Sequence, residues 1–310
     1  MLFRSGWIWK EAKIRLAEAG QPDNPRPPKV EPTKSNRAVA VAPEGSEFSG
    51  RSSAGKAALL AYYGGTKESE AAVELGLEWL KRHQSKDGSW SFDHVNAACK
   101  GDCKNPGNFK NSRMGATAMA LLAMLGSGNT YSVGDFQVPV ERGLMYLPTH
   151  GKTIDGDFRG KYDGNGGMYI QGLVTIVLCE ALAMSNAEME SSKGRRNQKK
   201  KKKSRLSRGK RMRFNRTLKA ASQQAIKFII NAQCSNGGWR YTPRIGPDTC
   251  VVGWQIMALA SAWSAKLGTF PVVSRKASGY LESVQSAQGS QYRNHHDSPQ
   301  PTASITYRSE

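Results

Sequence analysis

The chain has 310 residues, 38% of them hydrophobic, so it can form one large soluble domain or two small ones. Its net charge of +20 would indicate a nucleic-acid-binding face if the charge were spread evenly. Fourteen Lys and Arg residues and no acid lie between residues 193 and 216, which leaves a net charge of only +6 for the rest of the chain. This distribution excludes a basic face that covers the whole protein.

The basic run belongs to a segment, residues 191–217, that carries no recognised nucleic-acid-binding module. Its charge density is typical of a solvated, disordered insertion, and this is what we expect. The alternative is that residues 193–216 bind nucleic acid or an anionic membrane surface. Residues 1–50 are rich in Pro, Ser and charge, and we expect a mostly disordered tail and linker there. The domain should then span residues 51–302, followed by a short tail at 303–310.

The first twenty residues are charged too early to form a secretory signal, so we expect a cytoplasmic protein. Five cysteines at irregular spacing do not form a disulfide framework. Cys99 and Cys103 bracket a short loop, where they could pair, hold a metal or remain free thiols. His83, Asp93 and His94 flank the same stretch, and we expect them to lie at the surface or in turns.

Apolar periodicity predicts two kinds of helix that alternate along the chain. Amphipathic helices with one apolar face are expected near 71–84, 142–150, 222–233 and 275–285, after a lead-in helix at 56–63. Segments without a charged face lie between them, at 114–125, 168–184 and 250–265, and such helices should be buried on all sides. The segment 168–184 is just long enough to span a membrane, but its polar residues favour a buried core helix. Glu180 is its only charge, and we expect it near the helix end, reaching solvent.

The amphipathic segments are copies of one internal repeat, in which a helix is followed by glutamine, glycine and an aromatic residue. Two copies share the same spacing, and two are degenerate; the second copy has lost its glutamine. We expect the glutamine to bond loose backbone groups and the aromatic residue to fold back over the helix end. The residues concerned are Gln84, Gly88 and Trp90; Gly156 and Phe158; Gln233, Gly237 and Trp239; Gln285, Gly289 and Tyr292.

Half-buried helices that alternate with fully buried helices suit two concentric layers, and almost nothing in the chain predicts a strand. We therefore expect an all-α protein with an α/α toroid of inner and outer helices, incomplete at its C-terminus. A helical solenoid is the competing architecture, but both helices of each of its pairs usually keep an exposed face.

The stretches GLEWLKRHQSKDGSW and AIKFIINAQCSNGGW resemble the QW repeats of the squalene cyclase, terpenoid cyclase and protein prenyltransferase superfamily. The chain is most similar to the small squalene-cyclase-like proteins of planctomycete-type bacteria. The resemblance covers residues 51–302 apart from the basic run. It implies an α/α toroid around an apolar cavity, and an isoprenoid-like ligand or substrate. It is less specific for the reaction than for the fold.

The resemblance also implies positions for chemistry. Cyclases of this family protonate an alkene with a D-x-D-D motif, of which this chain keeps only Asp248, with Pro247 at the donor position. Standard polyene cyclisation is therefore doubtful, because a lone carboxylate lacks the neighbours that usually raise its pKa. Prenyltransferases of the superfamily bind zinc through Asp, Cys and a later His, for which Asp248, Cys250 and His295 are weak candidates. Helix capping by Asp248 and ordinary burial of Cys250 explain these two residues without a metal.

Three aromatic residues on the apolar helices, Tyr169, Trp254 and Trp263, could grip an isoprenoid chain, or they could be ordinary core residues. We expect no cofactor. Three functions remain open at this point: an isoprenoid-binding toroid with altered or lost activity, a non-catalytic module that uses its groove or basic loop to hold a protein partner, and a zinc prenyltransferase-like enzyme. A partner that completes the toroid is also possible.

Overall fold

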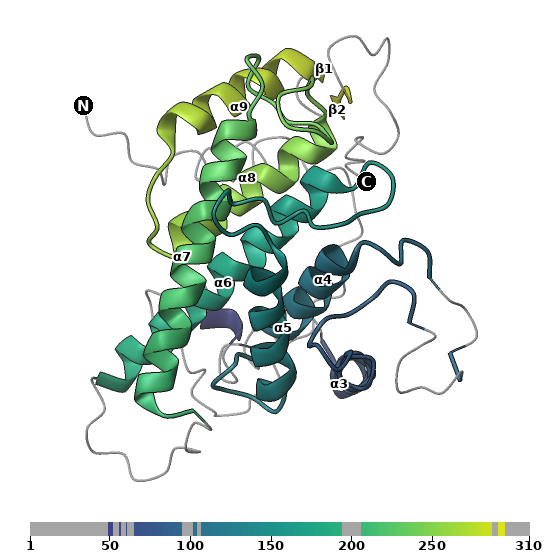
Figure 1. The fold of residues 1–310 in the computed structure, drawn as a ribbon, viewed down its shortest axis with the longest axis vertical. Helices are drawn as coiled ribbons and strands as arrows, with labels where there is room; N and C mark the ends of the chain where they lie inside the picture. The colour runs from purple at the N-terminus through teal and green to yellow at the C-terminus, as the bar shows by residue number, and fades with distance from the viewer. Residues whose placement is uncertain are drawn as a thin grey trace, which may run out of the picture.

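The computed structural model describes residues 49–51, 56, 60, 65–94, 102–103, 107–193, 206–286 and 291–294. Within them, seven α-helices follow the 3-10 helix η1 (Ser49–Arg51) (Figure 1). They are α3 (Lys67–Arg82), α4 (Arg113–Gly126), α5 (Gln137–His150), α6 (Gly167–Lys193), α7 (Arg208–Ala232), α8 (Thr249–Ser264) and α9 (Pro271–Val284). The only sheet in this part of the chain pairs two-residue strands, β1 (Gln285–Ser286) and β2 (Gln291–Tyr292). The predicted all-α class is confirmed.

Helix α6 lies at the centre of the molecule (Figure 1). It packs against α4 on one side and α8 on the other, so these three apolar helices form one row. The amphipathic helices pack on this row: α3 and α5 on α4, α7 on α6 and α8, and α9 on α8. The amphipathic helices α3, α5 and α7 are each followed along the chain by an apolar helix of the row, as the periodicity predicts, whereas α9 is followed by β1.

The segment 168–184 is a core helix, as predicted. Within the described residues, α6 is the only helix long and apolar enough to cross a membrane, over Gly167–Glu190, and 89% of an 18-residue apolar segment within it is buried. Glu180 lies in the middle of α6, where its carboxylate accepts a hydrogen bond of 2.7 Å from Arg51 Nη1. The prediction that Glu180 lies near a helix end was therefore wrong. An ion pair with Arg51 makes the burial of this carboxylate tolerable.

The outer two helices of the row differ from the prediction, because each leaves a stripe exposed. On α4 the side chain of Met119 is 51% exposed, and on α8 those of Met257 and Trp263 are 43% and 44% exposed. An uncharged helix is buried on every side only where other helices pack on every side of it. Helix α6 has them, whereas α4 and α8 stand at the two ends of the row.

The predicted insertion at 191–217 is shorter than expected. Helix α6 continues to Lys193, and α7 begins at Arg208, so residues 208–217 are helical; residues 194–205 lie outside the described residues. Phe214 explains the difference, since it is buried and its ring lies 4.3 Å from that of Tyr131. Arg211 also reaches Glu188 at the end of α6, at 3.5 Å. The packing of Phe214 and the ion pair of Arg211 stabilise as helix a segment that composition alone predicts to be a solvated loop.

Two corners of the fold are built by the same set of bonds. Gln84 Nε2 donates to Gly88 O and to Pro139 O in the first turn of α5, both at 2.9 Å. In the later corner Gln233 Nε2 donates to Gly237 O at 2.8 Å and to Val273 O in the first turn of α9 at 3.0 Å. This bonding by the glutamine was predicted and is confirmed. Each glutamine therefore ties its own turn to the next amphipathic helix.

The aromatic residue of each corner also behaves as predicted. Trp90 Nε1 donates to Leu80 O at 2.7 Å, and Trp239 Nε1 donates to Ile229 O at 2.8 Å, so both indoles lie back over the helix end. Gly237 has φ of +94°, and a Cβ there would lie 2.0 Å from Lys276 O. Glycine is required at this turn both by its backbone conformation and by the approach of α9.

In the second copy, a glutamine from another helix replaces the one that is missing. Gln171 of α6 donates through Nε2 to Gly156 O at 2.9 Å and to Ala225 O in α7 at 3.3 Å, while its Oε1 accepts from Phe158 N. In the last copy Gln285 is exposed and Tyr292 packs against the core. Gly289 lies outside the described residues, as do residues 1–48, 303–310 and most of the lead-in helix expected at 56–63.

Candidate functional site

A pocket of about 360 Å³ lies beside the first turns of α4 and α6. Its wall is mostly aromatic and aliphatic, with a few polar groups from the same turns and from the loops that precede them. The main lining residues are Phe92, Phe109, Tyr169, Ile170, Leu173, Tyr241, Ser112 and Asp163. Such a wall suits an apolar ligand with one polar end.

The polar side of the pocket is held by one network. Asp163 accepts hydrogen bonds from Asn111 N at 2.9 Å and Asn111 Nδ2 at 2.8 Å, and its own N–H donates to Ser112 Oγ at 3.0 Å. These bonds join the start of α4 to the loop before α6. Gly115 lies in the adjacent wall, where a Cβ would come within 3.1 Å of Ile170 Cγ1. The pocket is therefore shaped by the spacing between α4 and α6.

Asp248, the strongest catalytic candidate in the sequence, lies next to this pocket but does not line it. Its side chain is 1% exposed and caps α8: Oδ1 accepts from Cys250 N at 3.0 Å and from Val251 N at 3.4 Å. Its Oδ2 accepts a hydrogen bond of 3.3 Å from the Tyr241 hydroxyl. Tyr241 therefore connects the pocket to the buried carboxylate, and helix capping accounts for the position of Asp248.

The groups around Asp248 resist ionisation. Burial raises the pKa values of Tyr169 and Tyr241, and the negative charge of Asp248 raises both further. Burial and the same carboxylate also raise the pKa of the Cys250 thiol, and they raise the pKa of Tyr280. At neutral pH these tyrosines and this thiol are uncharged, so the site presents neutral hydroxyls next to one buried carboxylate.

The three aromatic residues selected from the sequence do not act together. Tyr169 lines the pocket, and its ring centre lies 6.1 Å from that of Tyr241. Trp254 packs against α6, since a Cβ built on Gly172 would lie 3.2 Å from Trp254 Cβ. Trp263 is largely exposed, and neither tryptophan is part of the pocket wall.

Sequence reasoning missed the aromatic residues that the loops contribute, because it searched only the apolar helices. Phe92 and Tyr241 occupy equivalent places, each two residues after the corner tryptophan of its repeat. Both line the pocket. Extending the repeat alignment by two residues would have identified them.

The weak zinc candidates receive little support from the geometry. Asp248 is engaged by the helix N-terminus, and the Cys250 thiol is kept protonated by burial. Among the residues that the structure describes, no three His, Cys, Asp or Glu side chains are placed to hold a metal ion. His295 lies outside the described residues.

Comparison with protein-family models, with curated proteins and with solved structures finds no match to this chain. The functional assignment therefore depends on the pocket, the corners and the sequence resemblance.

Proposed function

We propose that the protein is a squalene-cyclase-like α/α toroid that binds a short isoprenoid or similar apolar molecule. The pocket between α4, α6 and Tyr241 is the observation that carries this proposal. Its volume of about 360 Å³ is near the lower end of the roughly 300–1,000 Å³ usual for ligand sites. A short isoprenoid fits this size better than a long polyene.

The arrangement of helices supports the toroid part of the proposal. A row of three apolar helices covered by amphipathic helices corresponds to the inner and outer layers of such a fold. The corner glutamines tie α3 to α5 and α7 to α9 along the outer layer. Repeated corners of one geometry turn successive helix pairs in one direction, which would bend the row into an arc.

Binding without polyene cyclisation is the activity that the site supports. An acid that starts cyclisation must reach the alkene, and Asp248 lies behind Tyr241 with both carboxylate oxygens occupied. The neighbouring hydroxyls have raised pKa values and are poor acids. The same groups suit the recognition of a hydroxyl or other neutral polar end of a ligand.

Calorimetric titration with farnesol, a short isoprenoid alcohol, tests the proposal. Leu173→Phe narrows the pocket and should weaken binding about tenfold or more, because the added ring occupies ligand space. Trp263→Ala is the matched control, since Trp263 lies on an apolar helix but outside the pocket, and it should bind like the unmodified protein. Equal loss in both variants, or no binding by the unmodified protein, would contradict the proposal.

One observation favours a second candidate function, the binding of a protein partner that extends the row. Helix α8 stands at the end of the row and exposes Met257 and Trp263 together with Gly253, while Ala260 on the same face is half-buried. An exposed apolar stripe on a terminal helix suits contact with a further helix. Light scattering after chromatography tests this: Trp263→Glu should abolish any assembly, and a monomer in every condition with no partner bound would contradict it.

A further inference from the structure

A second cluster of reactive side chains lies at the end of α3, away from Asp248. The sulfur of Cys103 lies 3.3 Å from Nε2 of His83, twenty residues earlier in the chain. His83 lies in the turn after α3, as one of the two expected placements has it, but it is only 5% exposed, whereas Cys103 is half-buried and therefore reachable. The pair joins a nucleophile to a base within hydrogen-bonding distance.

The hydrogen bond of the other imidazole nitrogen, Nδ1, determines which tautomer His83 adopts. Nδ1 lies 2.7 Å from the carbonyl oxygen of Trp79, which can only accept a hydrogen bond. Nδ1 therefore carries the hydrogen, and in the neutral ring Nε2 presents its lone pair to the Cys103 thiol. The backbone of α3 thus orients the base, as a third group does in activated-nucleophile sites.

Aromatic contacts hold the imidazole in this position. The ring of Trp79 stacks on that of His83 with centres 3.8 Å apart and an angle of 22° between the planes. His94 packs edge-on against both, at 5.3 Å from Trp79 and 5.9 Å from His83. A base that cannot rotate keeps its lone pair directed at the sulfur, which favours proton transfer between them.

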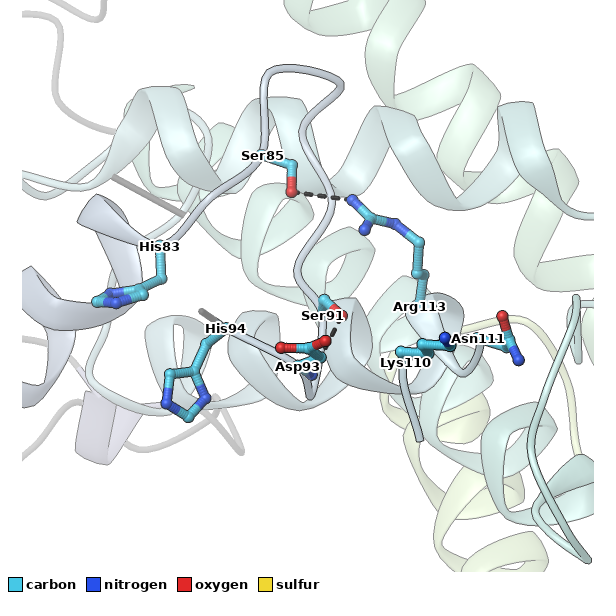
Figure 2. A pocket seen from close by; sticks show the side chains of 8 residues that line it. All are labelled: His83, Ser85, Ser91, Asp93, His94, Lys110, Asn111 and Arg113. Carbon is cyan, nitrogen blue, oxygen red and sulfur yellow. Dashed lines mark hydrogen bonds between the residues drawn. The ribbon is translucent and has the colours of Figure 1, made fainter. Parts of the chain in front are cut away.

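A polar pocket of about 220 Å³ is lined by His83, the base of the pair (Figure 2). His83 and His94 lie on one side of it, and Lys110, Asn111 and Arg113 lie on the other (Figure 2). Asp93 lies between them, with its N–H bonded to Ser91 Oγ, and Arg113 donates to Ser85 Oγ at 2.9 Å. Groups of both charges line the space, so it suits a polar small molecule and not an apolar one.

The other described cysteines lack this environment. Burial raises the pKa of Cys179 to about 12 and also raises the pKa values of Cys234 and Cys250, so all three remain thiols at neutral pH. A metal site is not favoured at Cys103, since no group of three suitable ligands exists among the described residues. The pair is better suited to chemistry of the sulfur itself.

We propose that Cys103 is a reactive thiol, activated by His83, that exchanges with polar low-molecular-weight disulfides. His83 Nε2 takes the thiol proton, and the Cys103 thiolate attacks one sulfur of the disulfide. The disulfide bond breaks, a mixed disulfide forms at Cys103, and the departing thiolate takes the proton from the imidazolium. The cysteine is oxidised and the departing half of the disulfide is reduced. This reaction needs only a thiolate and access to it, whereas acyl transfer also needs groups that stabilise an oxyanion.

The test uses dithiobis(nitrobenzoic acid), a polar aromatic disulfide that releases a coloured thiolate on exchange. The whole protein is used with Cys99→Ser, because Cys99 lies four residues before Cys103 in the sequence. At neutral pH we expect one equivalent to react faster than the thiols of the same protein in denaturant. Cys103→Ser should remove this fast phase, and Cys250→Ser, the matched control, should leave it unchanged.

His83→Asn isolates the base, since the asparagine amide can still donate near Trp79 O but provides no basic nitrogen to the thiol. It should slow the fast phase about tenfold or more, while His94→Asn should change it little. A circular-dichroism spectrum shows whether each variant is folded, and the comparison of unmodified protein with denatured protein holds even where a variant is not. A Cys103 rate equal to that in denaturant, an unchanged rate in folded His83→Asn, or one equivalent of zinc bound at Cys103 would overturn the proposal.

Discussion

Replacement of Gln233 by alanine should destabilise the fold at one corner without touching the core. The substitution removes two hydrogen bonds, of 2.8 Å to Gly237 O and 3.0 Å to Val273 O. At about 0.5–1.5 kcal/mol for each bond, the free energy of unfolding should fall by about 1–3 kcal/mol. For a domain of this size, a loss of 2 kcal/mol lowers Tm by about 4–8 °C.

Thermal and urea unfolding of matched variants measures this effect. Gln285→Ala is the control, because Gln285 occupies the same place in the last repeat but is exposed, and its effect should stay within about 0.5 kcal/mol. Gln233→Glu should cost more than Gln233→Ala, since a carboxylate would face two carbonyl oxygens. Equal stabilities of Gln233→Ala and Gln285→Ala would refute the idea that the corner glutamines tie successive helices together.

Three further predictions concern stability and the carboxylate. Gly237→Ala should lower the free energy of unfolding by more than about 2 kcal/mol, because its Cβ would lie 2.0 Å from Lys276 O. Gly253→Ala on α8 is the control: its Cβ would meet nothing within 4 Å, so the substitution should be neutral or stabilising. The midpoints of urea unfolding measure both effects. Burial raises the pKa of Cys179 from 9.0 to about 12, so the unfolded chain loses the thiol proton at a lower pH than the folded protein does. The free energy of unfolding should therefore fall by about 1.4 kcal/mol per pH unit as the pH rises from 9.0 to about 12. Cys179→Ala should remove this pH dependence. Asp248→Ala should lower the free energy of unfolding by about 1 kcal/mol, because the helix cap is lost. Asp248→Asn can still cap the helix and should bind farnesol with unchanged affinity. Loss of ligand turnover in Asp248→Asn would instead show that the carboxylate is catalytic.

Local patterns in the sequence were sufficient for the helices and for two of the corners. Period and charge separated the amphipathic helices from α4, α6 and α8, and the glutamine–glycine–tryptophan spacing predicted bonds that the structure shows. These features depend on residues close together in the chain. For that reason they can be read without knowledge of the tertiary arrangement.

Contacts between distant residues could not be read in the same way. Gln171 replaces the missing glutamine of the second copy from a different helix, and Phe214 turns part of a charged run into helix by packing on Tyr131. The exposed stripes of α4 and α8 follow from their positions at the ends of the row. In each case the tertiary neighbour, and not the local composition, decides the outcome.

The candidate sites show the same limit. Asp248 was identified, and so was its capping role, but its link to the pocket runs through Tyr241, which no helix pattern marks. His83 was expected at the surface or in a turn, and it does lie in the turn after α3, but its contacts with Trp79, His94 and Cys103 were not predicted. Aromatic stacking across a loop leaves no periodic signal in the sequence.

Photo-crosslinking with a diazirine analogue of farnesol tests the central claim most directly. The activated probe inserts into whatever side chains surround it, and mass spectrometry of the peptides then locates the bound ligand. Labelling should concentrate on the peptides that contain Tyr169, Leu173 and Tyr241 and should be displaced by excess farnesol. Labelling confined to the exposed stripe around Trp263, or spread over the surface and insensitive to competition, would contradict the pocket as the ligand site.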